Sequence, residues 1–435
     1  MMNKFYLFPH ILFVHGARNA ALYDLEKGGV YSIGSIEKAL LAYVLSKSGS
    51  IEHINIESRH KVMFFLNNLV NLGLGEFYKK NQPYREEIDL SSPLQVLRQL
   101  WLSLNNNCNL RCKHCYANSD QKSPRSTIDS EKILSVIKDA KENLSLESVQ
   151  LIGGEPLLLR RNQLETIIRG ANTLGIPFIE VFTNGIAICD FHLHLFKECG
   201  VHVAVSIYSD RPDDHDVITG MPGSWAKTVR AIESLLRHGI NVRCGVIAME
   251  QNKNSVKRVA SWLMENYGID QGGKDYDVVR SCGRGIDKSV IPWEMFKKQY
   301  IRTKPNFLPV SKKLVQNNMH FNSCCGSTAC IMPNGDVTPC EMENYIVQGN
   351  IYQDSLSSIL LGRAGEIAQR LSKEKIVVCK DCEYRYACWE CRAMCGIAVK
   401  ENKQKPNTCL YDPYTAKWRL PPDKETFFAE VFASS

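Results

Sequence analysis

The segment NNNCNLRCKHCYA, residues 105–117, decides the fold of this chain, because it places three cysteines within eight positions. Cys108, Cys112 and Cys115 follow the spacing CxxxCxxC directly after the apolar run LWLSLN at 100–105. Zinc and iron–sulfur sites usually take four protein ligands. Three thiolates therefore predict a cluster with one coordination position open, where a molecule carrying an amine and a carboxylate can bind.

Composition places the chain among ordinary globular proteins. It has 435 residues, 44% of them hydrophobic, and a net charge of +7, which is mild for this length and argues against a nucleic-acid partner. The 17 cysteines are odd in number and lie in tight groups, so we expect metal ligation in a reducing cytoplasm. Pro9 and His10 interrupt the apolar start, and no run reaches the roughly 18 apolar residues of a membrane span.

The middle of the chain alternates strand and helix patterns. Helical stretches at 129–144 and 223–239 separate the predicted strands, which are 100–105, 148–154, 178–184, 203–209, 242–248 and 276–281. Repeated βα units predict a parallel sheet, open or curled into a partial (β/α)6 barrel. The cysteine loop follows the first strand and so lies at the carboxyl ends of the strands, where active sites of such folds gather.

We expect three domains. Residues 1–95 contain short strands and two amphipathic helices, a pattern that fits a winged-helix module or simply an N-terminal layer on the main domain. A polar linker at 79–93 leads into the partial barrel at 96–310. Residues 311–435 crowd cysteines together with little periodicity, which is typical of a cluster-binding domain.

The cysteine loop resembles that of the radical S-adenosylmethionine (SAM) enzymes. The resemblance implies that Cys108, Cys112 and Cys115 hold a [4Fe–4S] cluster, and that SAM binds the open iron and is cleaved to a 5′-deoxyadenosyl radical. It also implies that His114 lies near the adenine, although a structural loop histidine is an equal alternative.

Three further segments match this family by position. Gly153, Gly154 and Glu155 follow the second strand and resemble the GGE motif, which implies that the turn binds the methionine amine of SAM. Asn184 and Ser206 lie toward the ends of the third and fourth strands, where family members contact SAM or its ribose; turn-capping is the plain alternative. For His215 and Asp216 in HDVITGMPGSW, we prefer a structural helix start to an acid–base role.

The C-terminal cysteines resemble those of the SPASM domain, which holds two auxiliary [4Fe–4S] clusters. The resemblance implies two ligand sets, which we call set I and set II. Set I is Cys324, Cys330, Cys340 and Cys391, and set II is Cys379, Cys382, Cys388 and Cys409. Cys325 remains an alternative to Cys324, and Cys395 an alternative to Cys391.

The N-terminal and C-terminal segments are similar to those of peptide maturases of the grasp-with-spasm type. This implies an enzyme that crosslinks a ribosomally synthesised precursor peptide through a C–C, C–O or thioether bond. The implied partners are the precursor with its leader, a flavodoxin-like or ferredoxin-like electron donor and an ATP-grasp ligase. Alternatives are peptide epimerisation, with Cys244 or Cys282 as hydrogen donor, sulfatase-maturase-like oxidation, a non-catalytic peptide-binding role and a zinc-scaffolded protein.

Overall fold

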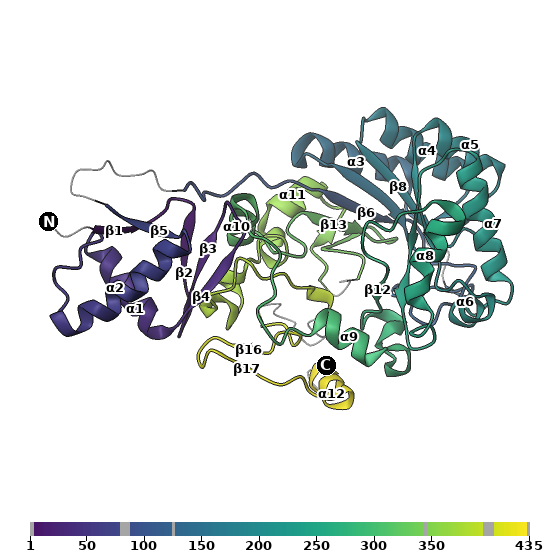
Figure 1. The fold of residues 1–435 in the computed structure, drawn as a ribbon. Coiled ribbons are helices and arrows are strands. Elements are labelled where there is room, and N and C mark those ends of the chain that lie inside the picture. Colours follow the sequence, from purple (N-terminus) through teal and green to yellow (C-terminus); the bar gives the residue numbers. More distant parts are fainter. Residues whose placement is uncertain (1–3, 79–87, 124–126, 343–345, 395–403, 433–435) are drawn as a thin grey trace.

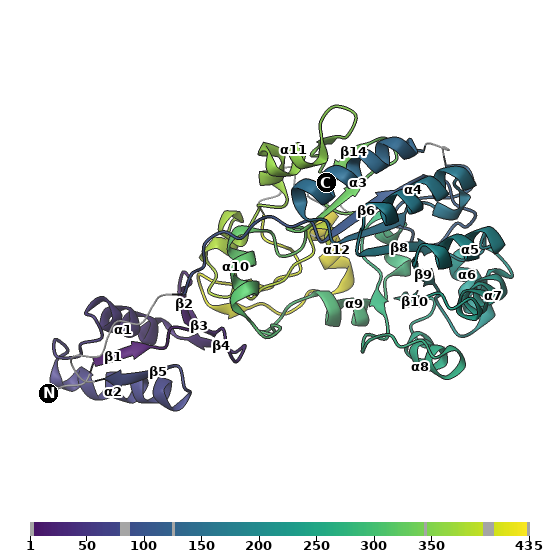
Figure 2. The same ribbon diagram turned by 90° about the horizontal axis from the view of Figure 1, so that it is seen from above.

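The computed structural model describes residues 4–78, 88–123, 127–342, 346–394 and 404–432. Three regions form a row in both views of Figures 1 and 2. The N-terminal unit lies at one end, the barrel-like unit at the other, and the cysteine-rich C-terminal region between them. The region that comes last in the sequence therefore connects the first two in space.

Five neighbouring parallel strands form one end of the main sheet, as the alternating pattern predicts. They are β6 (Gln99–Ser103), β7 (Ser148–Ile152), β8 (Phe178–Thr183), β9 (His202–Ser206) and β10 (Val242–Gly245), in the spatial order β10-β9-β8-β7-β6. The helices that alternate with them are α3 (Ser130–Leu144), α4 (Arg161–Thr173), α5 (Asp190–Glu198), α6 (Pro212–Thr219), α7 (Ser224–Arg237) and α8 (Val256–Tyr267). Successive side chains point to opposite faces of the sheet, and one face, with Leu100, Val149, Val181 and Val203, packs into the helix layer.

The last two predicted strands depart from a regular barrel. The expected strand at 242–248 is divided into β10 and β11 (Ile247–Ala248), and β12 (Asp277–Val278) pairs in parallel with β11 in a separate sheet. The side-chain amide of Asn252 donates to the carbonyl of Ile247 and occupies an acceptor at this break. The sixth βα unit therefore stands beside the main sheet and is not part of it.

The cysteine-rich region extends the main sheet. Strand β13 (Thr328–Ile331) pairs in parallel with β6, and β14 (Asp336–Thr338) and β15 (Gly349–Asn350) follow in antiparallel order, giving eight strands. The register places Cys330 opposite Trp101. The sheet therefore crosses the predicted boundary at 310/311, which itself stays a prediction.

The other helices and strands of the C-terminal half are short. They are α9 (Trp293–Tyr300), α10 (Lys312–His320), α11 (Leu356–Leu361), β16 (Tyr411–Asp412), β17 (Lys417–Trp418) and α12 (Lys424–Phe432). Helix α12 packs against α9 through aromatic contacts of Trp293 with Phe427 and Phe428, so the end of the chain is tied to the barrel. No helix in the described parts of the chain is both long and apolar enough to cross a bilayer.

The N-terminal unit contains two small sheets and two helices. Strands β2 (Ile11–His15), β3 (Ala20–Asp24) and β4 (Val30–Ile33) form an antiparallel meander, followed by α1 (Ser35–Ser46) and α2 (Ile56–Asn71). Strand β5 (Gly75–Tyr78) returns to pair with β1 (Lys4–Leu7). The predicted short strands and two helices are present, and the assignment of this unit as a winged helix remains a prediction.

This unit packs on the segment that carries the CxxC pair of set II. The hydroxyl of Tyr23 donates to the carbonyl of Glu383 at 2.9 Å, and the amide of Ala17 donates to the carbonyl of Asp381 at 2.7 Å. All five residues of β3 are buried, since one side faces α1 and α2 and the other faces Tyr384 and Tyr386. The first unit of the sequence is therefore seated on the cysteine-rich region.

Candidate active site

A cavity of about 860 Å³ lies along the face of the main sheet opposite the helix layer. Its lining runs from Gln99 and Phe178, near the amino ends of β6 and β8, to the carboxyl ends of the strands. All nine SAM-site residues expected from the sequence line this cavity: Cys108, Cys112, His114, Cys115, Gly153, Gly154, Glu155, Asn184 and Ser206. The fold therefore brings four separate segments to one place.

The three loop cysteines lie close enough to act on one another electrostatically. Burial, with a smaller contribution from the nearby charge of Glu155, raises the pKa of Cys108 to about 12. Its thiol is therefore protonated in the metal-free chain, and metal binding must release a proton there. Within the described residues, no three Cys, His, Asp or Glu side chains are placed to share one metal ion, whereas an iron–sulfur cube is held by separate thiolates.

A short turn that sequence reasoning missed clamps the cysteine loop. The guanidinium of Arg284 donates from Nε to the carbonyl of Cys112 at 2.7 Å and from Nη2 to the carbonyl of Ser119 at 2.8 Å. Its backbone amide donates to the carbonyl of Cys115 at 2.9 Å. These bonds fix both arms of the loop. The available signal was the position of Arg284 just after the predicted strand 276–281, where a loop at the carboxyl end of a strand is expected.

Gly283 lets this clamp approach the loop. It has φ +55°, and a Cβ there would stand 2.3 Å from the carbonyl oxygen of Tyr116. We expect Gly283→Ala to lose iron from the loop site and most SAM cleavage, because the clamp must move away. Gly175→Ala is the matched control, since Gly175 has φ +68° with open space around it and carries only the left-handed strain of about 1–2 kcal/mol. Equal iron content per chain in the two variants would contradict this prediction.

The opposite side of the loop rests on α6. The amides of Arg111 and Lys113 donate to the carbonyls of Thr219 and Ile218 at 3.1 and 2.9 Å. The carboxylate of Asp216 accepts hydrogen bonds from Ser224 and from the amide of Trp225, which lie at the start of α7. Asp216 lies within α6, and its carboxylate joins this helix to the first residues of α7.

The GGE turn contacts the loop backbone directly. The amides of Gly154 and Glu155 donate to the carbonyls of Asn105 and Asn107 at 2.8 and 2.9 Å. A Cβ on Gly154 would stand 2.1 Å from the Asn107 carbonyl oxygen, so the close approach that requires glycine here is to protein backbone. Glycine at this position therefore holds the second strand against the cysteine loop.

Glu155 is buried and its carboxylate already has three protein donors. It accepts hydrogen bonds from the Thr183 hydroxyl at 2.6 Å and from the amides of Asn184 and Leu157 at 2.9 and 3.1 Å. Burial raises the pKa of Glu155, and these hydrogen bonds oppose that shift. The carboxylate thus joins the GGE turn to the end of β8, an arrangement that the sequence did not predict.

Asn184 completes this connection. Its side-chain amide donates to Asn109 Oδ1 at 2.7 Å and lies 3.8 Å from the sulfur of Cys108. Its carbonyl accepts from the Thr228 hydroxyl of α7 at 2.9 Å. Asn184 therefore contacts the cysteine loop itself, as its expected position beside the site requires.

His114 and Tyr208 form the wall between the loop and β9. Their rings meet edge to face with centroids 4.8 Å apart. Burial, with a smaller contribution from the nearby Arg284, lowers the pKa of His114 to about 4, so the imidazole is neutral. Its Nδ1 atom is buried and has no hydrogen-bond partner among the described residues. A ligand in the cavity can supply that partner.

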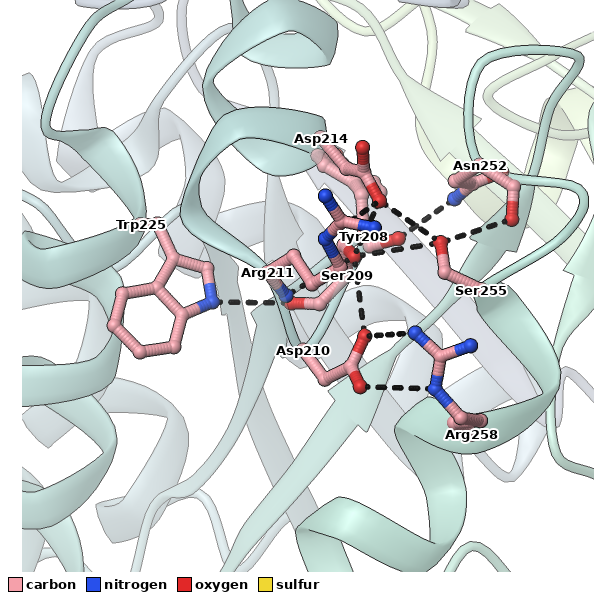
Figure 3. Close-up of polar contacts among 9 residues, drawn as sticks. All are labelled: Tyr208, Ser209, Asp210, Arg211, Asp214, Trp225, Asn252, Ser255 and Arg258. Carbon is pink, nitrogen blue, oxygen red and sulfur yellow. Dashed lines mark hydrogen bonds and ion pairs between the residues drawn. The ribbon is translucent and has the colours of Figure 1, made fainter.

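Figure 3 shows how the loop after β9, which carries Tyr208, is anchored. The amide of Asn252 donates to the Tyr208 carbonyl at 2.7 Å, and the indole of Trp225 donates to the Ser209 carbonyl at 3.1 Å. Arg258 pairs with Asp210 on the outside of the loop. Residues from α7, from α8 and from the turn before α8 thus hold this loop in place, although sequence reasoning named none of them.

The charge of the cavity suits a cationic ligand. Its lining contains six carboxylates, those of Glu155, Glu180, Asp270, Asp275, Asp277 and Glu341, against three cations, Arg243, Lys274 and Arg280. SAM carries a sulfonium and an ammonium group against one carboxylate. The three thiols of the loop therefore fit a cluster, and the acidic lining and the unpartnered nitrogen of His114 fit SAM.

The predicted ligands of set I lie mostly together. The thiols of Cys324 and Cys391 share a hydrogen bond, and Cys340 acts electrostatically on Cys324. Cys330, on β13, has Met332 and Thr338 as its side-chain neighbours. The sulfur of Cys325, the alternative to Cys324, is 3.7 Å from the carbonyl of Ala368, and Cys325 acts electrostatically on both Cys324 and Cys340. Within the described parts of the chain, no other cysteine of set I is among the groups that shift the pKa of Cys330. Cys395 lies outside the described residues.

Set II gathers around a second cavity, of about 630 Å³. Cys388 and Cys409 each act electrostatically on both Cys379 and Cys382. The guanidinium of Arg302 donates from Nη1 to the sulfur of Cys388 and from Nη2 to the carbonyl of Trp389. Three of the four cysteines line the cavity, so this set is reachable from solvent.

The grouped thiols of this fold suit iron–sulfur clusters, which proteins hold through cysteine thiolates. Residues 102–263 match the Radical SAM superfamily, and residues 324–383 match SPASM, an iron–sulfur cluster-binding domain. The chain is a radical SAM enzyme with a SPASM domain, and these two domains imply SAM and several [4Fe–4S] clusters as its cofactors.

Relatives within this family act on different molecules. The chain is 27% identical over 292 residues to the sporulation killing factor maturation protein SkfB of Bacillus subtilis, covering 64% of this chain and 68% of SkfB. It is 26% identical over 302 residues to a "Probable GTP 3′,8-cyclase" of Saccharolobus islandicus, covering 63% and 94%. The solved structure of Streptococcus suis SuiB bound to its precursor peptide SuiA has the same fold, with 16% identity, a TM-score of 0.55 and coverage of 93% and 99%.

Proposed function

We propose that this enzyme crosslinks a ribosomally synthesised precursor peptide. The observation that carries the proposal is the extent of the likeness to SuiB bound to SuiA, which includes the N-terminal unit as well as the two cluster regions. The relationship to SkfB, a maturation protein, supports the same class of substrate. The cavity runs the full length of the strands, which leaves room for a peptide segment beside SAM.

In this proposal Cys108, Cys112 and Cys115 hold the SAM-binding cluster, and sets I and II hold the auxiliary clusters. When bound, the clusters supply the one-electron chemistry that cleaves SAM. Arg284 and Gly283 keep the loop in position, and neutral His114 offers Nδ1 as an acceptor to the adenine amine. Asn184 and Ser206 face the ribose side of SAM, and the GGE turn faces its methionine end.

Two residues of the GGE turn also make contacts within the protein. Gly154 serves the backbone contact with Asn107, so any methionine contact comes from the turn as a whole. Glu155 orients Asn184 through its carboxylate, and only its remaining lone pairs are open to an ammonium group. The turn therefore positions neighbouring residues of the site and also offers its own groups to the methionine end of SAM.

The N-terminal unit is proposed as the leader-binding domain. Strand β4 is paired on one side only among the described strands, which leaves one edge for a leader peptide to join as an extra strand. The N-terminal unit packs on the CxxC segment of set II, so a leader bound to this unit would lie alongside the cluster domain. A flavodoxin-like or ferredoxin-like donor and an ATP-grasp ligase complete the proposed partners.

Epimerisation is the second candidate, because two thiols line the cavity. Cys244 lies on β10 and Cys282 precedes the clamp, and both are buried. A thiol in this position can give a hydrogen atom to a peptide radical. Sulfatase-maturase-like oxidation shares the same site, and the products distinguish the three reactions.

Co-expression with the small open reading frames beside the gene, in normal and heavy water, tests the proposal. We expect one peptide to lose two hydrogens by mass spectrometry and to show a crosslinked fragment pattern. Uptake of one deuterium with otherwise unchanged composition would instead favour epimerisation. A peptide that binds but stays unmodified, with no 5′-deoxyadenosine formed by the reconstituted enzyme under dithionite, would contradict both.

A further inference from the structure

The cavity beside set II is built differently from the one beside the cysteine loop. It lies between α9, the following segment and the cysteine segments at 379–391 and 406–409. Five cations line it against two carboxylates, whereas carboxylates outnumber cations in the SAM cavity. The two cavities therefore attract partners of opposite charge.

Two of the lining cations are free to meet a partner. Lys298 on α9 and Lys304 just beyond it are exposed, and neither makes a salt bridge to another described residue. Lys297 pairs with Glu294 at 2.8 Å, and buried Lys373 pairs with Glu390 at 2.9 Å. In each pair the glutamate largely cancels the charge of the lysine. The uncompensated charge thus lies at the mouth of the cavity.

Few residues separate the mouth of this cavity from the cysteines of set II. Arg302, two residues before Lys304, contacts the sulfur of Cys388. The Arg302 backbone also pairs with the Cys409 segment, with its amide donating to the Thr408 carbonyl at 2.8 Å and its carbonyl accepting from Leu410 at 3.1 Å. Trp389, next to Cys388, is 49% exposed. A protein seated at the mouth would therefore be in contact with residues that touch set II.

We propose that this lysine-rimmed cavity is the docking surface of an acidic one-electron carrier protein, which reduces the cluster held by set II. The carrier is oxidised by one electron and the cluster is reduced by one, so no other reactant is needed. The inference rests on the proposed function, because it takes set II to hold a cluster. The acidic SAM cavity would repel the same carrier.

Stopped-flow reduction of the reconstituted holoenzyme by a fully reduced, acidic flavodoxin tests the proposal. The test variant is Lys298→Glu with Lys304→Glu. The control is Lys197→Glu with Lys257→Glu, which changes net charge equally on exposed positions of α5 and α8. We expect the test variant to lower the second-order rate at low salt at least tenfold and to flatten its dependence on ionic strength, whereas the control keeps both within about twofold.

Two further measurements make the result decisive. Carbodiimide coupling of the carrier to the unmodified holoenzyme should join carrier carboxylates to Lys298 or Lys304. Equal slowing of both double variants, or coupling only at other lysines, would overturn the docking surface. SAM cleavage driven by dithionite should stay unchanged in the test variant. Failure of dithionite-driven cleavage in the unmodified enzyme, or iron well below three clusters, would instead overturn the proposed function.

Discussion

Cys112→Ala is expected to abolish SAM cleavage and to reduce bound iron from roughly twelve to roughly eight atoms per chain. Cys112 lies in the middle of the clamped loop and interacts with both other loop cysteines. Removing its thiol leaves two ligands for a four-iron cube, while sets I and II keep theirs. Iron and sulfide analysis of anaerobically reconstituted protein, with chromatography for 5′-deoxyadenosine, measures both effects.

The control for this variant is Cys199→Ala. Cys199 is buried at the end of α5, outside both cavities, so its loss should cost only packing energy of about 1 kcal/mol. We expect full iron and normal SAM cleavage. Deoxyadenosine formation by Cys112→Ala at the unmodified rate would show that the loop is not the reactive site.

Arg284→Ala is expected to weaken cluster retention at the loop roughly a hundredfold, with a corresponding loss of SAM cleavage. The side chain supplies two charged hydrogen bonds to opposite arms of the loop, and such bonds contribute about 1.5–3 kcal/mol each. Water replaces part of these two hydrogen bonds in the variant, so we expect a net loss of about 3 kcal/mol in cluster retention. The rate of iron release to a chelator, compared with that of the unmodified enzyme, measures the effect.

Arg258→Ala provides the comparison. Arg258 pairs with Asp210 at 3.3 Å on the outside of the β9 loop, where an exposed ion pair contributes about 0–1 kcal/mol. Arg284→Lys should recover only part of the retention, because an ammonium group cannot bond two carbonyls in a fixed fork. Unchanged iron release in Arg284→Ala would show that the loop keeps its shape without the clamp.

Much of the site was predictable because its residues lie at strand ends. Cys108, Glu155, Asn184 and Ser206 lie at or just beyond the carboxyl ends of four successive strands, and parallel strands bring those ends to one edge. The resemblance to the SPASM domain likewise implied the four cysteines of set II, and the structure brings these four together. The clamp at Arg284 was not predictable in the same way, since neither its residue types nor its spacing form a pattern.

Two features of the fold also exceeded what periodicity can predict. The division of the strand at 242–248 depends on Asn252, whose amide reaches back to the carbonyls of Ile247 and Tyr208. The pairing of β13 with β6 joins residues more than 200 positions apart, and nothing in either strand specifies its partner. Local pattern predicts that a strand exists, whereas its neighbour depends on packing across the whole chain.

The sequence by itself determined the chemistry of this protein: the spacing of its thiols specifies clusters, and the alternation of strands and helices specifies a parallel sheet. Only the tertiary structure decided how each residue serves that chemistry, turning Gly154 and Glu155 toward the loop and placing Arg284 across it. It also separated an acidic cavity from a basic one. The reason is physical: ligand type and strand pattern are local properties of the chain, whereas hydrogen-bond partners and local electrostatic fields depend on which distant segments fold together.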